Sequence, residues 1–237
     1  SSTTAFSFTA DTAPLLSSFT PILNATDTAK STTVTLNFDQ DVQAGTGDIK
    51  IYEVGGTLHQ TIDITTVSFS NNTVQFDATN LDPSTSYYIT IDNQAIYDTD
   101  AGFWFIGITA NNVIKFTTGA LPTLVLQTTT PAHRTANIIL TASNSVGAGT
   151  GNLYFYKADG TLLDTIDVIS AYNAGTGEIS INPSVDLEPS TSYYVLYDAN
   201  IVQHNGFYNT AESNTATHTF TSGAVPFYTA VSPTHNT

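Results

Sequence analysis

An eight-residue string that occurs twice constrains the fold of this chain more than any other feature. Leu-Asp-Pro-Ser-Thr-Ser-Tyr-Tyr stands at residues 81–88, and Leu-Glu-Pro-Ser-Thr-Ser-Tyr-Tyr stands at residues 187–194. Such a string before alternating apolar residues is typical of a tyrosine corner, in which a tyrosine hydroxyl hydrogen-bonds to the backbone a few residues upstream. We therefore expect Tyr87, Tyr193, Pro83 and Pro189 to be structural residues, with both tyrosines buried.

The rest of the chain repeats in the same register. Residues 34–64 align without a gap with residues 138–168. The second copy has two additional residues before its tyrosine string, which we place in the loop around Asn173, and its last loop is shorter by two. Loops absorb such changes more readily than strands do. The sequence therefore predicts two domains, at residues 11–119 and 120–223.

Within each copy, apolar residues alternate with polar ones, as in strands that bury one face. In the first copy the predicted inward residues are Val34, Leu36, Phe38, Ile49, Ile51, Ile62, Ile64, Val74, Phe76, Tyr87, Ile89, Ile91, Ile114 and Phe116. No window carries a sustained helical stripe with caps, so no helix longer than a turn is expected. About seven strands per copy and a tyrosine corner predict an all-β fold of two tandem immunoglobulin-like (Ig-like) β-sandwiches.

The charge balance limits the possible partners. Five Lys and Arg residues against twenty Asp and Glu residues give a formal net charge of -15. Such a surface repels nucleic acid and anionic lipid, so no nucleic-acid partner is expected. No apolar run reaches the ~20 residues of a membrane helix, so the chain is not expected to span a membrane. The absence of cysteine excludes disulfides and cysteine-based metal sites.

The two ends of the chain resemble parts of further copies. Residues 116–122 and 220–226 share a Phe-Thr-Thr/Ser-Gly-Ala-Leu/Val-Pro junction, and residues 8–14 are similar. Residues 1–10 therefore resemble the last strand of a preceding repeat, and residues 224–237 resemble the first strand of a following one.

Two interpretations of these ends stay open. In the first, which we favour because each domain has its own first and last strands, the chain is a piece of a longer tandem array. In the second, it is a self-assembling subunit of a surface filament, sheath or virion appendage, whose terminal strands add to the sheet edges of identical subunits.

Four stretches of the first copy carry a family resemblance. They are Asp-Gln-Asp-Val-Gln-Ala-Gly-Thr-Gly-Asp-Ile at residues 39–49, Gly-Thr-x-x-x-Thr-Ile-Asp-Ile at 56–64, the tyrosine string, and Asp-Thr-Asp-Ala-Gly-Phe-Trp-Phe-Ile-Gly-Ile at 98–108. Together they resemble the bacterial Ig-like module of SbsA type. The second copy departs from this pattern at residues 204–209, which lack the acid.

The resemblance implies a structural or adhesive segment of an extracellular tandem-repeat protein at the cell surface, such as an S-layer or adhesin-like rod. Its partners would be neighbouring Ig-like repeats or identical subunits. Such modules serve several roles, so the resemblance indicates the fold more closely than the function.

Two acidic loops in the first copy are candidates for a cofactor. The six residues are Asp39, Asp41, Asp48, Asp92, Asp98 and Asp100. Ca²⁺ takes several carboxylate and carbonyl oxygens that converge at a loop, so these are candidate calcium ligands that would stiffen a junction between domains. The alternative, solvated turn acids, is favoured because the second copy has Ser or Asn at the first three positions.

Three consecutive aromatic residues, Phe103, Trp104 and Phe105, are the candidate binding surface. They cannot all point inward, because the faces of an extended strand alternate. One interpretation is a docking patch for sugar or protein, which would make the chain a carbohydrate-binding module. The other, which we prefer, is a plug between the domains near Leu121.

No pattern indicates catalysis. The five histidines lack the spacing of a transition-metal site, and no nucleophile elbow is present, so an enzyme is not expected. Asp63 and Asp167 recur at equivalent positions, and we expect them to be exposed acids on the surface of a sheet that discourage edge pairing.

Overall fold

The computed structural model describes residues 11–100 and 102–225. It divides into two compact units, and the main boundary along the chain falls between Ala120 and Leu121. The terminal strands predicted at residues 1–10 and 224–237 lie outside the described residues, apart from Ala224 and Val225. Within the described part of the chain, no helix is long and apolar enough to cross a membrane.

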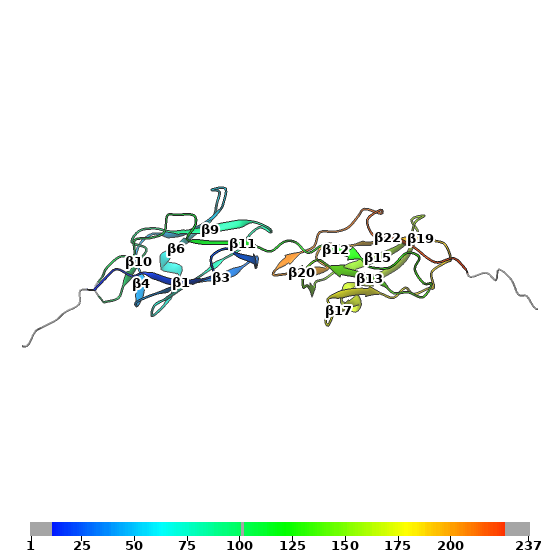
Figure 1. The fold of residues 1–237 in the computed structure, drawn as a ribbon, viewed down its shortest axis with the longest axis horizontal. Coiled ribbons are helices and arrows are strands. Elements are labelled where there is room, and N and C mark those ends of the chain that lie inside the picture. The colour runs from blue at the N-terminus through cyan, green and yellow to red at the C-terminus, as the bar shows by residue number, and fades with distance from the viewer. Residues whose placement is uncertain (1–10, 101, 226–237) are drawn as a thin grey trace, which may run out of the picture. The chain divides into compact units, whose positions relative to one another are not determined.

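The first domain is built from two main sheets, which Figure 1 shows as a lower layer containing β1 and β3 and an upper layer containing β9 and β11. The four-stranded sheet has the order β1 (Leu16–Thr20), β3 (Thr32–Phe38), β8 (Thr73–Ala78) and β7 (Ser68–Ser70). The five-stranded sheet has the order β2 (Ala25–Thr28), β11 (Ile114–Thr118), β9 (Ser86–Ile91), β5 (Asp48–Glu53) and β6 (Leu58–Asp63). A separate pair is formed by β10 (Ile96–Asp98) and β4 (Val42–Ala44).

The second domain repeats this plan. One sheet has the order β12 (Leu124–Leu126), β13 (Ile138–Ala142), β18 (Glu178–Ile181) and β17 (Tyr172–Asn173). The other has the order β16 (Leu162–Asp167), β15 (Asn152–Lys157), β19 (Ser192–Tyr197) and β22 (Thr219–Thr221). A small sheet contains β14 (Gly147–Ala148), β20 (Val202–His204) and β21 (Phe207–Tyr208).

Helix is confined to single turns in the described residues. A 3₁₀ turn, Ile64–Thr66, follows β6, and α1 (Val168–Ala171) follows β16. The prediction of an all-β fold with two tandem sandwiches and no longer helix is therefore confirmed.

The alternating residues predicted to point inward form the core of the first domain. Thirteen of the fourteen are buried, and Ile62 is partly buried against them. A matching cluster in the second domain includes Ile138, Leu140, Leu153, Phe155 and Phe220. Each domain thus buries the inner faces of its own two sheets, which is the dominant favourable term in folding.

The tyrosine corner is present in both domains. Tyr87 and Tyr193 are 0% and 1% exposed. The Tyr87 hydroxyl accepts a hydrogen bond of 2.8 Å from the backbone N–H of Asp82, and the Tyr193 hydroxyl accepts one of 2.7 Å from that of Glu188. Each tyrosine therefore satisfies a backbone donor in the loop that precedes its own strand.

A second buried hydroxyl joins each corner to the last strand of its domain. Thr118 Oγ1 accepts from the Thr85 N–H at 3.0 Å and donates to the Asp82 carbonyl. Ser222 makes the equivalent bonds, to the Thr191 N–H and the Glu188 carbonyl. The corner thus connects three parts of the sandwich: the loop, the strand that carries the tyrosine, and the closing strand.

Asp63 and Asp167 are exposed, and each also caps a turn. Asp63 Oδ1 accepts from the Thr65 N–H at 2.8 Å, and Asp167 Oδ1 accepts from the Ile169 N–H at 2.8 Å. The side-chain hydrogen bond from Thr65, followed by its backbone N–H, lowers the pKa of Asp63. These carboxylates recur in both copies at N-caps, where carboxylate side chains are favoured.

Removal of the Tyr87 hydroxyl is expected to destabilise the first domain. Tyr87→Phe leaves the Asp82 N–H, whose hydrogen bond is partly buried, without its acceptor, which costs about 1–2 kcal/mol. Urea denaturation followed by the fluorescence of Trp104, the only tryptophan of the chain, measures this change in the first domain alone. Tyr88→Phe, on the same strand but partly exposed, is the control, and an equal loss in that variant would contradict the prediction.

Candidate functional site

Two acidic residues, one at the start of β5 and one directly after β9, lie beside a lysine of the same sheet. Lys50 Nζ lies 2.9 and 2.7 Å from the two carboxylate oxygens of Asp92, and 3.5 Å from Asp48. Its hydrogen bond lowers the pKa of Asp92, and the same bond raises the pKa of Lys50. One of the two negative charges that would attract a calcium ion here is therefore already compensated.

Asp98 organises the loop that follows β10. It is 2% exposed, and its Oδ1 accepts from the N–H groups of Asp100 and Gly102 at 3.1 and 2.7 Å. Its Oδ2 accepts from the Phe103 N–H at 2.9 Å. A carboxylate acceptor for three amides fixes the backbone that leads into the aromatic residues.

The carboxylates of the remaining predicted calcium ligands do not take part in the hydrogen bonds around the Asp98 carboxylate. Asp39 Oδ1 accepts from the Leu15 N–H at 2.8 Å, and the side chains of Asp41 and Asp100 are exposed. Among the described residues, no three of the six aspartates place their carboxylates within 4.8 Å of one another. The structure thus does not bring them together as one site, and calcium binding stays a prediction.

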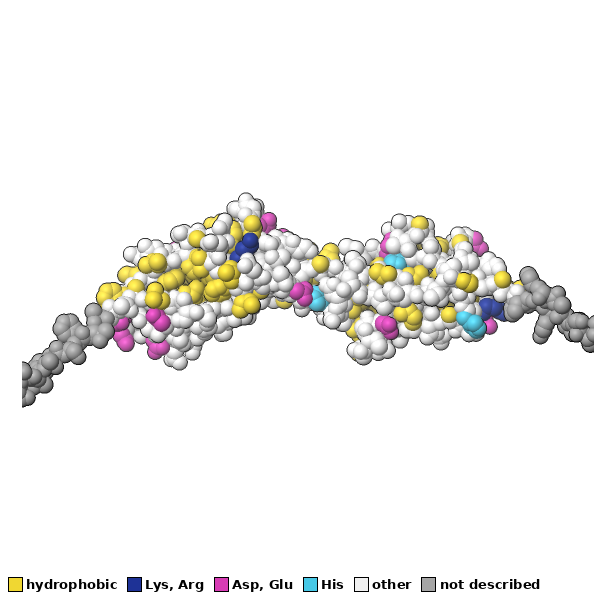
Figure 2. All heavy atoms as spheres, viewed as in Figure 1, with side chains coloured by type: hydrophobic (Ala, Val, Ile, Leu, Met, Phe, Trp, Pro, Cys, Tyr) yellow, Lys and Arg dark blue, Asp and Glu magenta, His cyan; other side chains and the backbone are white. Residues whose placement is uncertain are grey.

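The three consecutive aromatic residues divide between core and surface. Phe105 is buried and packs edge-to-face on Phe38, with ring centroids 5.2 Å apart. Phe103 and Trp104 are 45% and 39% exposed, and the Trp104 ring lies 4.8 Å from that of Tyr97. Figure 2 shows hydrophobic side chains gathered on the visible face of this domain, including the end where Figure 1 draws β10.

A glycine allows this arrangement. A Cβ at Gly45 would lie 2.5 Å from Cζ3 of Trp104 and 2.2 Å from the Gln94 carbonyl oxygen. Real Cβ atoms do not approach so closely, so the Trp104 ring can rest on β4 and its turn only because residue 45 has no side chain.

The predicted interdomain plug is wrong, because these aromatics lie at the far end of the first sandwich from the junction. Ile91, at the end of β9, pairs with Ile108 of the aromatic loop. Ser86, at the start of β9, pairs with Thr117, next to the junction. Five residue steps of about 3.3 Å separate the two ends of this strand by roughly 17 Å.

The second domain has two buried polar side chains and one partly buried carboxylate where the first has only isoleucines. Tyr197, Glu212 and His218 correspond to Ile91, Ile108 and Ile114. The Tyr197 hydroxyl lies 3.2 Å from His218 Nε2, and Glu212 Oε2 lies 3.8 Å from the same nitrogen. Burial lowers the pKa of His218, and burial, with a smaller effect of Glu212, raises the pKa of Tyr197 to about 12. These polar side chains, with a hydrogen bond between Tyr197 and His218, replace the aliphatic packing of the first domain.

One group that the sequence analysis did not single out does bring three potential metal ligands together. Glu53, His59 and Asp82 have ligand atoms within 4.8 Å of one another. They are too far apart in the sequence to form a spacing motif. The available signal was their divergence, since the aligned residues of the second copy are Lys157, Leu163 and Glu188.

The strand order, the two packed sheets and the tyrosine corner define an Ig-like β-sandwich protein. Residues 10–118 match the family model described as "Bacterial Ig-like domain". This match covers the first domain; it does not reach the second and does not distinguish the SbsA type, which stays a prediction. A search of curated proteins found no match.

Solved structures also match this chain at low identity, among them the following three. The "Biofilm associated protein - BSP domain" is 17% identical with a TM-score of 0.27, and the alignment covers 86% of this chain and 29% of that one. The fibronectin(III)-like modules of Clostridium thermocellum CbhA are 12% identical with a TM-score of 0.24, covering 89% and 93%.

Dimeric latent PorU from Porphyromonas gingivalis is 14% identical with a TM-score of 0.32, covering 90% of this chain and 20% of that chain. The chain thus spans less than a third of the length of the biofilm protein and of PorU. At these TM-scores the similarities carry no argument about function.

Loss of the Asp98 carboxylate is expected to destabilise the first domain. Asp98→Ala leaves three loop amides without an acceptor in a buried position, which costs about 2–4 kcal/mol. Urea denaturation followed by Trp104 fluorescence measures the loss. Asp100→Ala, which removes an exposed carboxylate from the same loop, should change stability by less than about 0.5 kcal/mol, and a similar cost for both variants would be evidence against the assigned role.

Proposed function

We propose that the chain is a structural or adhesive segment of an extracellular bacterial surface protein built from tandem Ig-like repeats, of the S-layer or adhesin type. The family match of the first domain supports the bacterial surface setting. The observation that carries the proposal is the way in which an early segment of each domain is joined to the end of that domain.

In the first domain, an early strand runs parallel to the closing strand. β2 pairs with β11 in parallel, and the pairing is extended by hydrogen bonds from the Asn24 N–H to the Lys115 carbonyl at 2.7 Å and from the Gly119 N–H to the Thr28 carbonyl at 3.0 Å. A pull on the two ends of the domain loads these bonds in shear. Several bonds must then break together before either strand moves.

The second domain uses the same arrangement. Ala132 forms a parallel bridge with Ser222, the Ala132 N–H donates to the Thr221 carbonyl, and the Gly223 N–H donates to the Ala132 carbonyl, both at 2.8 Å. In both domains a parallel connection thus joins an early segment to the end of the domain, which suits a segment that transmits tension along its chain. Short proline-containing junctions limit the freedom of the backbone between such units.

Single-molecule force spectroscopy tests the proposal. The chain should unfold in two separate events, each releasing about 35 nm of chain from roughly 105 residues at up to ~3.6 Å each. Gly119→Pro removes the donor to Thr28 and should lower the force of one event only. Gly55→Ala, at an open hairpin position, is the control and should leave both forces unchanged. A single low-force event in the unsubstituted chain would argue against a role under tension.

The exposed aromatic surface favours a second candidate function, docking of a carbohydrate. Phe103 and Trp104 present flat apolar faces beside Tyr97, on a loop that Asp98 holds in place. Aromatic faces of this kind suit the apolar faces of sugar rings. This candidate concerns the first domain alone, because the corresponding loop of the second domain has a different sequence.

Trp104 fluorescence reports directly on such docking. Titration with bacterial and host oligosaccharides should quench or shift the emission, with saturation, and Phe103→Ala should weaken the response at least several-fold. Tyr208→Ala, an exposed aromatic of the second domain, should have no effect. A silent glycan array together with unchanged Trp104 emission would remove this candidate.

A further inference from the structure

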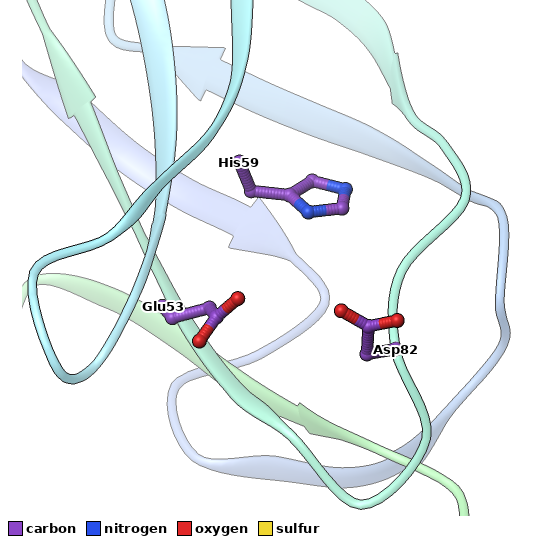
Figure 3. A group of neighbouring side chains, drawn as sticks. All are labelled: Glu53, His59 and Asp82. Atoms are coloured by element: carbon purple, nitrogen blue, oxygen red, sulfur yellow. The ribbon is translucent and has the colours of Figure 1, made fainter.

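Three side chains from separate elements converge beside the tyrosine corner of the first domain. Glu53 ends β5, His59 lies on β6, and Asp82 follows Leu81 in the corner itself. One ligand atom from each lies within 4.8 Å of the other two. Figure 3 shows the two carboxylates facing each other across a gap, with one ring nitrogen of His59 directed toward that gap.

The position of His59 depends on a bulge in the β5–β6 pair. Ile51 pairs with Gln60 and Tyr52 pairs with Leu58, so His59 is an additional residue without a partner on β5. A bulge re-aims the side chain that it carries. The ring packs on Tyr87, with centroids 5.1 Å apart, and its Nε2 lies 3.0 Å from the Thr79 carbonyl oxygen.

This contact with Thr79 determines which nitrogen of a neutral ring can bind a ligand. A carbonyl oxygen only accepts hydrogen bonds, so Nε2 carries the hydrogen and Nδ1 keeps its lone pair. Histidines that bind metal ions characteristically donate their other N–H to a carboxylate or a backbone carbonyl, which fixes the tautomer and the ring orientation. His59 has that outer hydrogen bond.

At the equivalent position of the second domain, a positive and a negative side chain stand together. There Lys157 replaces Glu53, Leu163 replaces His59 at the equivalent bulge, and Glu188 replaces Asp82. The Lys157 ammonium forms an ion pair with Glu188. The second domain therefore supplies its own cation at this position.

The first domain has a net negative charge at this position, where the second domain has a balanced pair. Two carboxylates stand there, and in the described part of the chain neither forms an ion pair with Lys or Arg. The exchange of a lysine for a glutamate, together with the exchange of a leucine for a histidine, converts a site with a built-in cation into one that lacks it.

We propose that Glu53, His59 and Asp82 bind a divalent first-row transition ion, with Zn²⁺ as the best match. Imidazole suits Zn²⁺ and its neighbours, whereas Ca²⁺ and Mg²⁺ prefer oxygen ligands alone. Three protein ligands leave one tetrahedral position for water or for an acceptor group from another molecule. Ligand atoms around Zn²⁺ lie about 3.3 Å apart, so the partly exposed Glu53 and exposed Asp82 side chains rotate inward on binding.

The bound ion would crosslink the β5–β6 hairpin to the tyrosine corner of the first domain. It would thereby join the same two positions of the sandwich that the Lys157–Glu188 ion pair joins in the second domain. The inference rests on the geometry of this domain and does not depend on the proposed role under tension or on sugar docking.

Isothermal titration of the tag-free chain with ZnCl₂ tests the site. We expect saturable binding of one ion per chain, a higher thermal midpoint for the first domain, and tetrahedral absorption bands when Co²⁺ is used in place of Zn²⁺. CaCl₂ and MgCl₂ at the same concentrations should raise the thermal midpoint of the first domain much less than ZnCl₂ does. Absence of saturable Zn²⁺ binding, or binding that Ca²⁺ matches, would overturn the proposal.

Substitutions that copy the second domain provide the matched control. Glu53→Lys with His59→Leu should fold, since Lys157 and Leu163 occupy these places in a sandwich of the same plan, and should lose at least 100-fold in Zn²⁺ affinity. His59→Gln keeps a polar side chain and should lose binding as well. Retention of the same affinity in either folded variant would show that the ion binds elsewhere.

The reverse exchange tests whether these three residues, placed at the same positions of the second domain, are sufficient to bind Zn²⁺. Lys157→Glu with Leu163→His and Glu188→Asp recreates the ligand set in the second domain. The stoichiometry should rise from one to two Zn²⁺ per chain. If this variant folds, as judged by circular dichroism, and still binds only one ion, then the three residue types at these positions do not suffice and the assignment fails.

Discussion

The hydrogen bond between a buried tyrosine hydroxyl and a backbone amide is the interaction on which the rest of each sandwich depends. Tyr87 and Tyr193 stand on central strands of their sheets, and each accepts from the loop five residues upstream. Both hydrogen bonds are partly buried, and the loss of an acceptor there is costly, so the corner has one favourable arrangement. The same loop is tied to the last strand by Thr118 or Ser222, and the last strand pairs in parallel with an early segment.

The two domains share a backbone plan but differ in the charged and polar side chains at equivalent positions. Beside the corner, the Lys157–Glu188 pair of the second domain stands where the first has Glu53, His59 and Asp82. At the other end, the three isoleucines of the first domain stand where the second has Tyr197, Glu212 and His218. Lys50 pairs with Asp92, whereas the Tyr154 hydroxyl contacts the equivalent Asp198. The duplication preserved packing and hydrogen bonding of the backbone, while the charged and polar groups around it diverged.

This division has a functional consequence for a tandem array. The corner, the bulge and the parallel connection to the closing strand are common to both domains. Both groups proposed to bind a ligand lie in the first domain: the Phe103–Trp104 surface organised by Asp98, and the Glu53–His59–Asp82 group. In the proposed role, repeats of one plan would transmit tension alike while individual repeats take on separate binding properties.

The sequence alone determined the fold class, the strand positions and the tyrosine corner, because alternation of apolar residues and the repeated string report directly on local backbone structure and burial. It also placed Phe103, Trp104 and Phe105 together, but it could not tell at which end of the sandwich they lie. Only the tertiary structure decided that Asp98 binds loop amides, that Lys50 neutralises Asp92, and that Glu53, His59 and Asp82 converge. These outcomes depend on the register between strands distant in sequence and on one bulge, and neither leaves a spacing that a linear pattern can reveal.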